Sequence, residues 1–311
     1  MAKGESNKKA FTVVDSNFLS RGTRCAGWLC RPGHVQDPPI VIMGHGFAAE
    51  RTFRLPAYAE RFVERGIAAF LFDYRNFGGS DGQPRNLVDP SRHLQDWEAA
   101  VAHVRSLKGV HNNRIALWGS SFGGGHVIVT AAKNAGIDAI VAQVPFVDGL
   151  STLSALGLRN TLQAVGAGLR DLGRRVTFRE PYYIPVVGTP DRFAAMNKRG
   201  AYEGYLAIVP PDSSWKNECP ARVFLAAPFY RPISYADRVS CPALLVVAEQ
   251  DSLIPAAVVE KTAARMSKAT VVRLPVGHFD VYVGEIFERV VQVESDFLAK
   301  HLLGARGNSL A

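Results

Sequence analysis

Long hydrophobic runs are absent from this chain of 311 residues. Its longest apolar runs, such as Ile67–Phe72, fall far short of the ~20 residues that a membrane-spanning helix needs. The first nine residues are polar and contain no apolar core, so we expect no secretion signal and a cytoplasmic location. Internal repeats and low-complexity tracts are also missing, which leaves an ordinary globular protein as the starting hypothesis.

Cysteine is scarce as well. No two of the four cysteines have C-x-x-C spacing, and no histidine cluster completes a zinc-binding set. We therefore expect free thiols in a reducing compartment and no metal site. The four residues are Cys25, Cys30, Cys219 and Cys241.

The net charge of +8 is not accompanied by a nucleic-acid-binding signature. Basic residues are spread along the chain, with modest clusters at Lys8-Lys9 and between Arg170 and Arg179. We interpret them as a solvated surface and expect no nucleic-acid partner.

Apolar runs typical of buried strands alternate with stretches of helical periodicity. Between 89 and 107, for example, Leu94, Trp97, Val101 and Val104 recur at three- and four-residue steps. This alternation predicts an α/β fold in which helices cover both faces of a mostly parallel sheet. Strands are expected near residues 11–17, 24–31, 39–43, 67–72, 115–118, 137–144, 243–248 and 270–274.

One segment breaks the alternation. Residues 146–235 are rich in Arg, Gly and Pro and contain helical pieces such as Asn160–Leu172. Because the segment lies between two expected strands, we interpret it as an inserted helical cap or lid. Residues 1–145 and 236–311 then form the core domain.

The pattern G-x-S-x-G spans Gly119 to Gly123. An apolar strand precedes it and a helical stretch follows, which is the context of a nucleophile elbow. In such a turn the backbone segments approach so closely that glycine is required on either side of the serine. The pattern nominates Ser121 as a nucleophile. A Ser/Gly-rich loop that caps a helix is the alternative.

A nucleophilic serine needs a base and an acid that orients the base. Asp251 follows the expected strand at 243–248 and is the favoured acid, with Asp148 and Glu249 as alternatives. His278 follows the last expected strand, is preceded by a glycine, and is the favoured base. The order Ser121, Asp251, His278 is that of an α/β-hydrolase site.

Two backbone N–H groups should stabilise the oxyanion. We expect them from Phe122, next to the serine, and from Phe47 in the glycine-containing loop 43–48. The same loop fits the dinucleotide fingerprint G-x-G-x-x-A at Gly44–Ala49. However, Pro56 indicates a helix that begins too late to meet a pyrophosphate, so we favour the oxyanion loop.

Taken together, these motifs resemble the α/β-hydrolase superfamily over nearly the whole chain. Residues 73–82, DYRNFGGSDG, resemble its D-x-R-G-x-G-x-S-x-G loop, with Asn76 where glycine is common. The resemblance implies an eight-stranded sheet. It is closest to the dienelactone-hydrolase-like and polyketide-transferase-like branch, although Ser121 replaces the cysteine usual in dienelactone hydrolases.

The predicted activity is that of a carboxylesterase that cleaves small-molecule acyl esters through an acyl-enzyme and needs neither metal nor organic cofactor. Three alternatives stay open at this point. They are a thioesterase or acyltransferase acting on carrier-bound acyl groups, a peptidase or amidase, and a non-catalytic binding scaffold. The sequence leaves the oligomeric state open, a dimer included.

Overall fold

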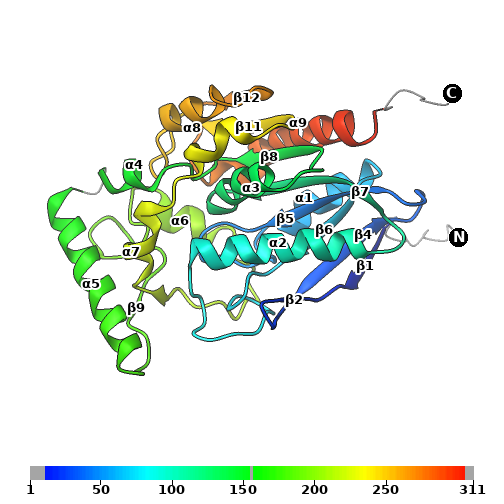
Figure 1. The fold of residues 1–311 in the computed structure, drawn as a ribbon. Helices are drawn as coiled ribbons and strands as arrows, with labels where there is room; N and C mark the ends of the chain where they lie inside the picture. The colour runs from blue at the N-terminus through cyan, green and yellow to red at the C-terminus, as the bar shows by residue number, and fades with distance from the viewer. Residues whose placement is uncertain (1–10, 155–156, 305–311) are drawn as a thin grey trace, which may run out of the picture.

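A computed structural model of the chain describes residues 11–154 and 157–304. An eight-stranded sheet forms its centre, in the order β1-β4-β6-β5-β7-β8-β11-β12 (Figure 1). β1 and β4 pair antiparallel at one edge, β4 runs antiparallel to β6, and all later pairs are parallel. The strands are β1 Phe11–Asp15, β4 Gly27–Pro32, β5 Pro39–Gly44, β6 Ala68–Phe72, β7 His111–Ser120, β8 Ala139–Gln143, β11 Ala243–Ala248 and β12 Ala269–Leu274.

Parallel strands buried on both faces require apolar residues at every position. Strands β5, β6, β8 and β11 are buried along their whole length, which explains why their sequences are continuous apolar runs. The predicted mostly parallel, eight-stranded sheet is confirmed.

Helices cover both faces of this sheet. On one face α1 (Leu55–Glu64) packs against α9 (Gly284–Leu302), which also contacts β7, β8 and β11. On the other face, turned toward the viewer in Figure 1, α2 (Pro90–Ser106) packs against α3 (Phe122–Lys133). The short helix α8 (Ala256–Ala263) contacts β11 and β12.

Residues 146–235 connect β8 to β11 and lie on the left of Figure 1, at the side of the sheet away from the two termini. The longest element there is the helix α5 (Leu158–Val176), which packs on α7 (Val223–Ala226). The remaining elements are short: α4 Gly149–Ser154, β9 Tyr183–Ile184, α6 Ala201–Leu206, β10 Cys219–Pro220, and the 3-10 helices η1 Ala227–Phe229 and η2 Pro232–Arg238.

The structure adds details that periodicity did not predict. A small hairpin of β2 (Phe18–Ser20) and β3 (Thr23–Cys25) interrupts the first antiparallel pair, and β7 begins four residues earlier than its apolar run. The exposed start of β7 is polar and therefore gave no signal. No helix within residues 11–154 and 157–304 is both long and apolar enough to span a membrane.

Candidate active site

Ser121 occupies a strained turn between β7 and α3. Its φ of 55° and ψ of −119° lie in a region that non-glycine residues rarely adopt. The turn is fixed on both sides, because the Ser121 N–H donates to the Gln143 carbonyl (2.8 Å) and its carbonyl accepts from Phe146 N–H (2.8 Å). A Cβ on Gly123 would lie 2.6 Å from the carbonyl oxygens of Gly44 and His45, so glycine is required there.

His278 lies between Ser121 and Asp251. Its Nδ1 is 2.6 Å from Asp251 Oδ2, and its Nε2 is 3.0 Å from Ser121 Oγ. A carboxylate only accepts hydrogen bonds, so Nδ1 donates to Asp251 and Nε2 is left to accept from the serine hydroxyl. The two side chains of the His278–Asp251 pair are almost completely buried, at 2% and 3% exposure, which strengthens their interaction.

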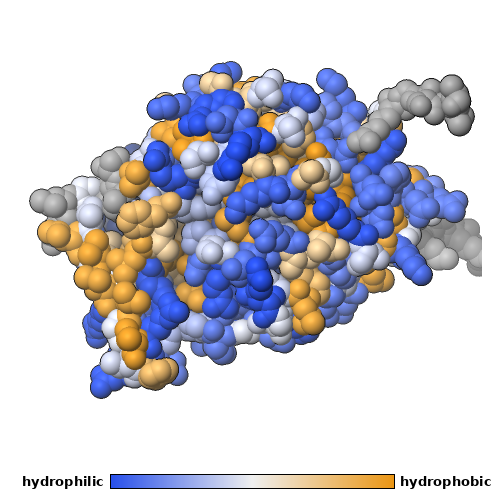
Figure 2. Space-filling model, in the orientation of Figure 1, coloured by the Kyte–Doolittle hydropathy of each residue, from blue (hydrophilic) through white to orange (hydrophobic). Residues whose placement is uncertain are grey.

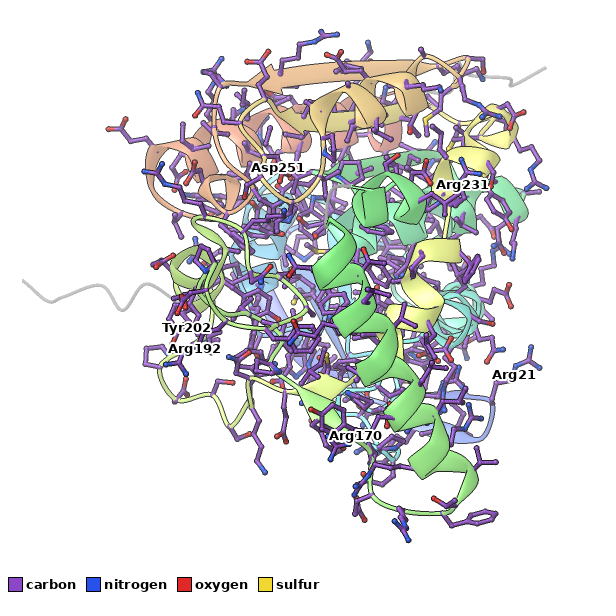
Figure 3. All side chains as sticks on the ribbon, turned by 90° about the vertical axis from the view of Figure 1, so that its left-hand side faces the viewer. Arg21, Arg170, Arg192, Tyr202, Arg231 and Asp251 are labelled. Carbon is purple, nitrogen blue, oxygen red and sulfur yellow. The ribbon has the colours of Figure 1, made fainter. Side chains whose placement is uncertain are left out.

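Each of these residues follows the carboxyl end of a strand. Ser121 comes directly after β7, Asp251 follows β11, and His278 follows β12. The other oxygen of Asp251 accepts from the N–H groups of Leu253 (2.7 Å) and Ile254 (3.0 Å), which holds the carboxylate in place. Figure 3 looks onto this end of the sheet and shows Asp251 above α5. The structure thus brings together three residues that lie far apart in the sequence.

The loop after β5 lies against the serine. A Cβ on Gly46 would lie 3.2 Å from Ser121 Cβ, and the rings of Phe47 and Phe122 meet edge to face at 5.7 Å. Buried His45 bonds the Gly46 carbonyl through Nδ1 (3.0 Å), and burial lowers the pKa of His45 to about 4. The imidazole is therefore neutral and supports the loop.

Two aromatic residues that the sequence interpretation missed also hold this loop. Tyr205 donates its hydroxyl to the Phe47 carbonyl (3.0 Å), and the Trp215 indole N–H donates to the Ala48 carbonyl (2.9 Å). Both come from residues 146–235, where irregular structure leaves no periodic signal that could have identified them.

The loop after β6 packs against the loop after β5 and helps to hold it in place. Asp73 accepts from the Arg51 backbone N–H (2.7 Å), pairs with the Arg51 guanidinium, and accepts from Gly79 N–H (3.0 Å). Asn76, the departure from the superfamily pattern, has φ of 77°, a conformation that asparagine tolerates better than most residues. Its side-chain amide donates to the Pro84 carbonyl (2.9 Å), so the substitution fits the loop.

The alternative residues have other roles. Asp148 forms an ion pair with Arg231 (2.7 Å) and accepts from Ser151 Oγ, and Glu249 is exposed. The nearby His126, on α3, is buried and bonded to the Tyr230 hydroxyl (2.7 Å) rather than to the serine. The helix α1 begins only at Leu55, so the G-x-G-x-x-A pattern does not sit at a helix N-terminus.

A largely apolar pocket of about 160 Å³ opens from Ser121. Residues 146–235 contribute much of its wall, together with Phe47, Phe122 and the loop after β11. A second, smaller pocket of about 20 Å³ also borders Ser121 and is lined by His278 and Tyr282. In the larger pocket, the wall residues contributed by residues 146–235 include Ala164, Val165, Met196, Val223 and Phe224.

All four cysteines are buried free thiols. Burial raises the pKa of Cys30 and Cys241 to about 11, so these thiols stay protonated at neutral pH. In the described part of the chain, no three His, Cys, Asp or Glu side chains gather as a metal-binding group.

Comparison with known proteins agrees with this architecture. The Quorum-quenching protein AidA of Acinetobacter baumannii (strain MDR-ZJ06) is 39% identical over 287 residues, which are 92% of this chain and 94% of that protein. The polyketide transferase grgF of a Penicillium species is 28% identical over 295 residues, covering 94% of this chain and 95% of that protein. The crystal structure of the alpha/beta hydrolase GrgF from Penicillium sp. sh18 superposes with a TM-score of 0.79 at 26% identity, covering 94% and 99% of the two chains.

The sequence profile described as the Alpha/beta hydrolase family matches residues 40–292. This range includes the elbow at Ser121, the acid candidate Asp251 and the base candidate His278. The chain belongs to the alpha/beta hydrolase family.

Proposed function

We propose that this protein is a serine hydrolase of carboxylic esters in which Ser121, His278 and Asp251 form a catalytic triad. The observation that carries the proposal is the hydrogen-bond chain from Asp251 through His278 to Ser121 Oγ, which ends in an apolar pocket. A buried, ordered chain of this kind activates a serine hydroxyl that is otherwise a weak nucleophile.

In the proposed mechanism, Ser121 Oγ attacks the acyl carbon while His278 Nε2 takes the hydroxyl proton. Asp251 stabilises the imidazolium that forms, and the backbone N–H groups of Phe47 and Phe122 donate to the oxyanion. His278 then gives its proton to the leaving alcohol, and the acyl group stays on Ser121. Water, deprotonated by His278, attacks this ester and releases the carboxylic acid and the free serine.

We further propose that residues 146–235 act as a cap that selects the acyl group. They contribute apolar walls to the larger pocket, which suits a hydrocarbon chain, and Tyr205 from the same segment anchors the oxyanion loop. The smaller pocket beside His278 is where the leaving alcohol would depart, close to the proton donor.

A series of p-nitrophenyl esters of increasing acyl length tests this proposal. We expect turnover with a preference for chains that fill the larger pocket, and no turnover by Ser121→Ala. Ser120→Ala is the matched control, because Ser120 bonds Tyr282 and Gln143 and lies outside the hydrogen-bond chain. Equal activity of wild-type protein and Ser121→Ala would overturn the proposal.

Acyl transfer from a thioester is the second candidate function. It is favoured by the similarity to a polyketide transferase over nearly the full length and by the largely apolar lining of the pocket beside Ser121, since a dry site protects an acyl-enzyme from hydrolysis. Supplying a short-chain acyl thioester with an added alcohol distinguishes the two, because a transferase forms the new ester faster than the free acid.

A further inference from the structure

The helix α5 has an apolar face that points away from the rest of the protein. Its inner face consists of small residues such as Ala167 and Gly168, and a Cβ on Gly168 would lie 2.7 Å from the Leu225 side chain. The opposite face carries large apolar side chains at alternating three- and four-residue steps, which form one continuous stripe. We call it the α5 stripe; its members and their exposed fractions are Leu162 64%, Val165 37%, Leu169 55%, Leu172 39% and Val176 68%.

Within the described residues, the outer part of this face packs against little of the protein, and only Val165 of the α5 stripe also lines the pocket beside Ser121. Gly166 and Gly173 lie between the stripe and Arg170, and an added Cβ at either one would meet no described atom outside the neighbouring helix backbone within 4 Å. Phe178, just beyond the helix, is 98% exposed. Figure 2 shows hydrophobic residues gathered over α5. A contiguous apolar face of this extent is typical of a docking surface rather than of free monomer surface.

The borders of the α5 stripe are basic. At 100° per residue, Arg170 and Arg175 lie on opposite sides of it, and Arg179 follows the helix. Figure 3 shows Arg170 beside the lower half of α5, where its guanidinium stacks on the Tyr182 ring at 4.1 Å. The only acidic residue of α5, Asp171, is buried and paired with Arg222 (2.6 Å). The exposed charges on the described part of this helix are therefore all positive.

This charge pattern argues against pairing with a second copy. In an antiparallel pair of α5 helices the two Arg170 borders would meet, and in a parallel pair the Arg170 border would meet the Arg175 border. Like charges would oppose each other in both arrangements. An apolar face flanked by arginines instead matches the boundary between anionic headgroups and acyl chains.

We propose that α5 docks the protein onto an anionic lipid surface, with the α5 stripe among the acyl chains and its arginines at the headgroups. Val165 belongs to the stripe and also lines the pocket that opens from Ser121. Docking would thus place the pocket near lipid-dissolved substrates. This consequence rests on the proposed esterase function, whereas docking itself does not.

Sedimentation of the full-length protein with vesicles tests the proposal. The vesicles contain phosphatidylcholine alone or phosphatidylcholine with a minority of phosphatidylglycerol. We expect binding to the anionic vesicles that weakens as salt is added. Leu162→Asp/Leu169→Asp should reduce binding at least about tenfold, and Arg175→Gln/Arg179→Gln should reduce it about fivefold for each charge removed.

Two matched variants make the same types of substitution at exposed positions outside α5. Leu19→Asp alters an exposed leucine on β2, and Arg289→Gln an exposed arginine on α9; both should bind like wild type. An unchanged thermal unfolding midpoint shows that the α5 variants are folded. The proposal would be overturned if the wild-type protein did not bind the vesicles, or if the α5 variants bound them as strongly as the wild-type protein does. So would a wild-type dimer in sedimentation analysis that Leu162→Asp/Leu169→Asp dissociates.

Discussion

Glu294 is a buried carboxyl group on α9, next to the strand that leads to Ser121. Its side chain has no solvent exposure, and its Oε2 accepts from the Trp118 indole N–H (2.8 Å). Oε1 has no hydrogen-bond partner in the described part of the chain. Burial raises the pKa of Glu294 to about 8, and the Trp118 hydrogen bond offsets this only in part. The folded protein therefore keeps this carboxyl group protonated at neutral pH.

Glu294→Gln removes this titration with little change in shape. The unfolded chain releases the proton near the ordinary pKa of 4.5, whereas the folded chain retains it to about pH 8. In this window the unfolded state binds fewer protons than the folded state, so wild-type stability falls as the pH rises. Glutamine has no such proton, so the stability of the variant relative to wild type should rise by about 3 kcal/mol between about pH 5 and pH 7. Above about pH 8 the difference should level off.

Urea unfolding at a series of pH values measures this difference directly. Glu98→Gln, at an exposed position of α2, is the matched control, because it makes the same chemical change on a solvated side chain. A free-energy difference for Glu294→Gln that does not change with pH would contradict the raised pKa, because the carboxyl group would then titrate alike in the folded and unfolded states.

Three further changes concern the site itself. Gly123→Ala places a Cβ 2.6 Å from two backbone carbonyl oxygens; ester turnover should fall at least about a hundredfold, whereas Gly166→Ala, at an open position, should leave it unchanged. Asp251→Asn should lower kcat by roughly 10²–10⁴-fold with a smaller effect on KM, because His278 loses its preferred tautomer. Steady-state kinetics that give the wild-type kcat for this variant would contradict the role of Asp251. Tyr205→Phe removes the hydrogen bond to the Phe47 carbonyl and should lower kcat about tenfold, and an effect confined to KM would assign Tyr205 to substrate binding instead.

Much of the core could be predicted because its strands are buried on both faces. Such strands as β5 and β11 must be apolar at every position, so they are visible as short uninterrupted runs. Ser121, Asp251 and His278 each follow an expected strand. Because parallel strands place their carboxyl ends at one edge of the sheet, the three residues could be predicted to lie close together.

Residues 146–235 could be recognised only as a break in the pattern. Their contacts depend on tertiary packing, as the hydrogen bonds of Tyr205 and Trp215 to the loop after β5 show. A helical piece was expected at Asn160–Leu172, within α5. The sequence could not tell that its apolar stripe faces outward, because the inner face of the helix consists of small residues such as Ala167 and Gly168. Glu294 gave no signal either, because a glutamate in an amphipathic helix is ordinarily exposed.

Labelling with a fluorophosphonate followed by mass spectrometry tests most directly whether Ser121 is the nucleophile. We expect one stoichiometric adduct on the wild-type protein and on Ser120→Ala, and none on Ser121→Ala. An adduct that persists in Ser121→Ala, or a wild-type protein that remains unlabelled while folded, would contradict the proposed triad.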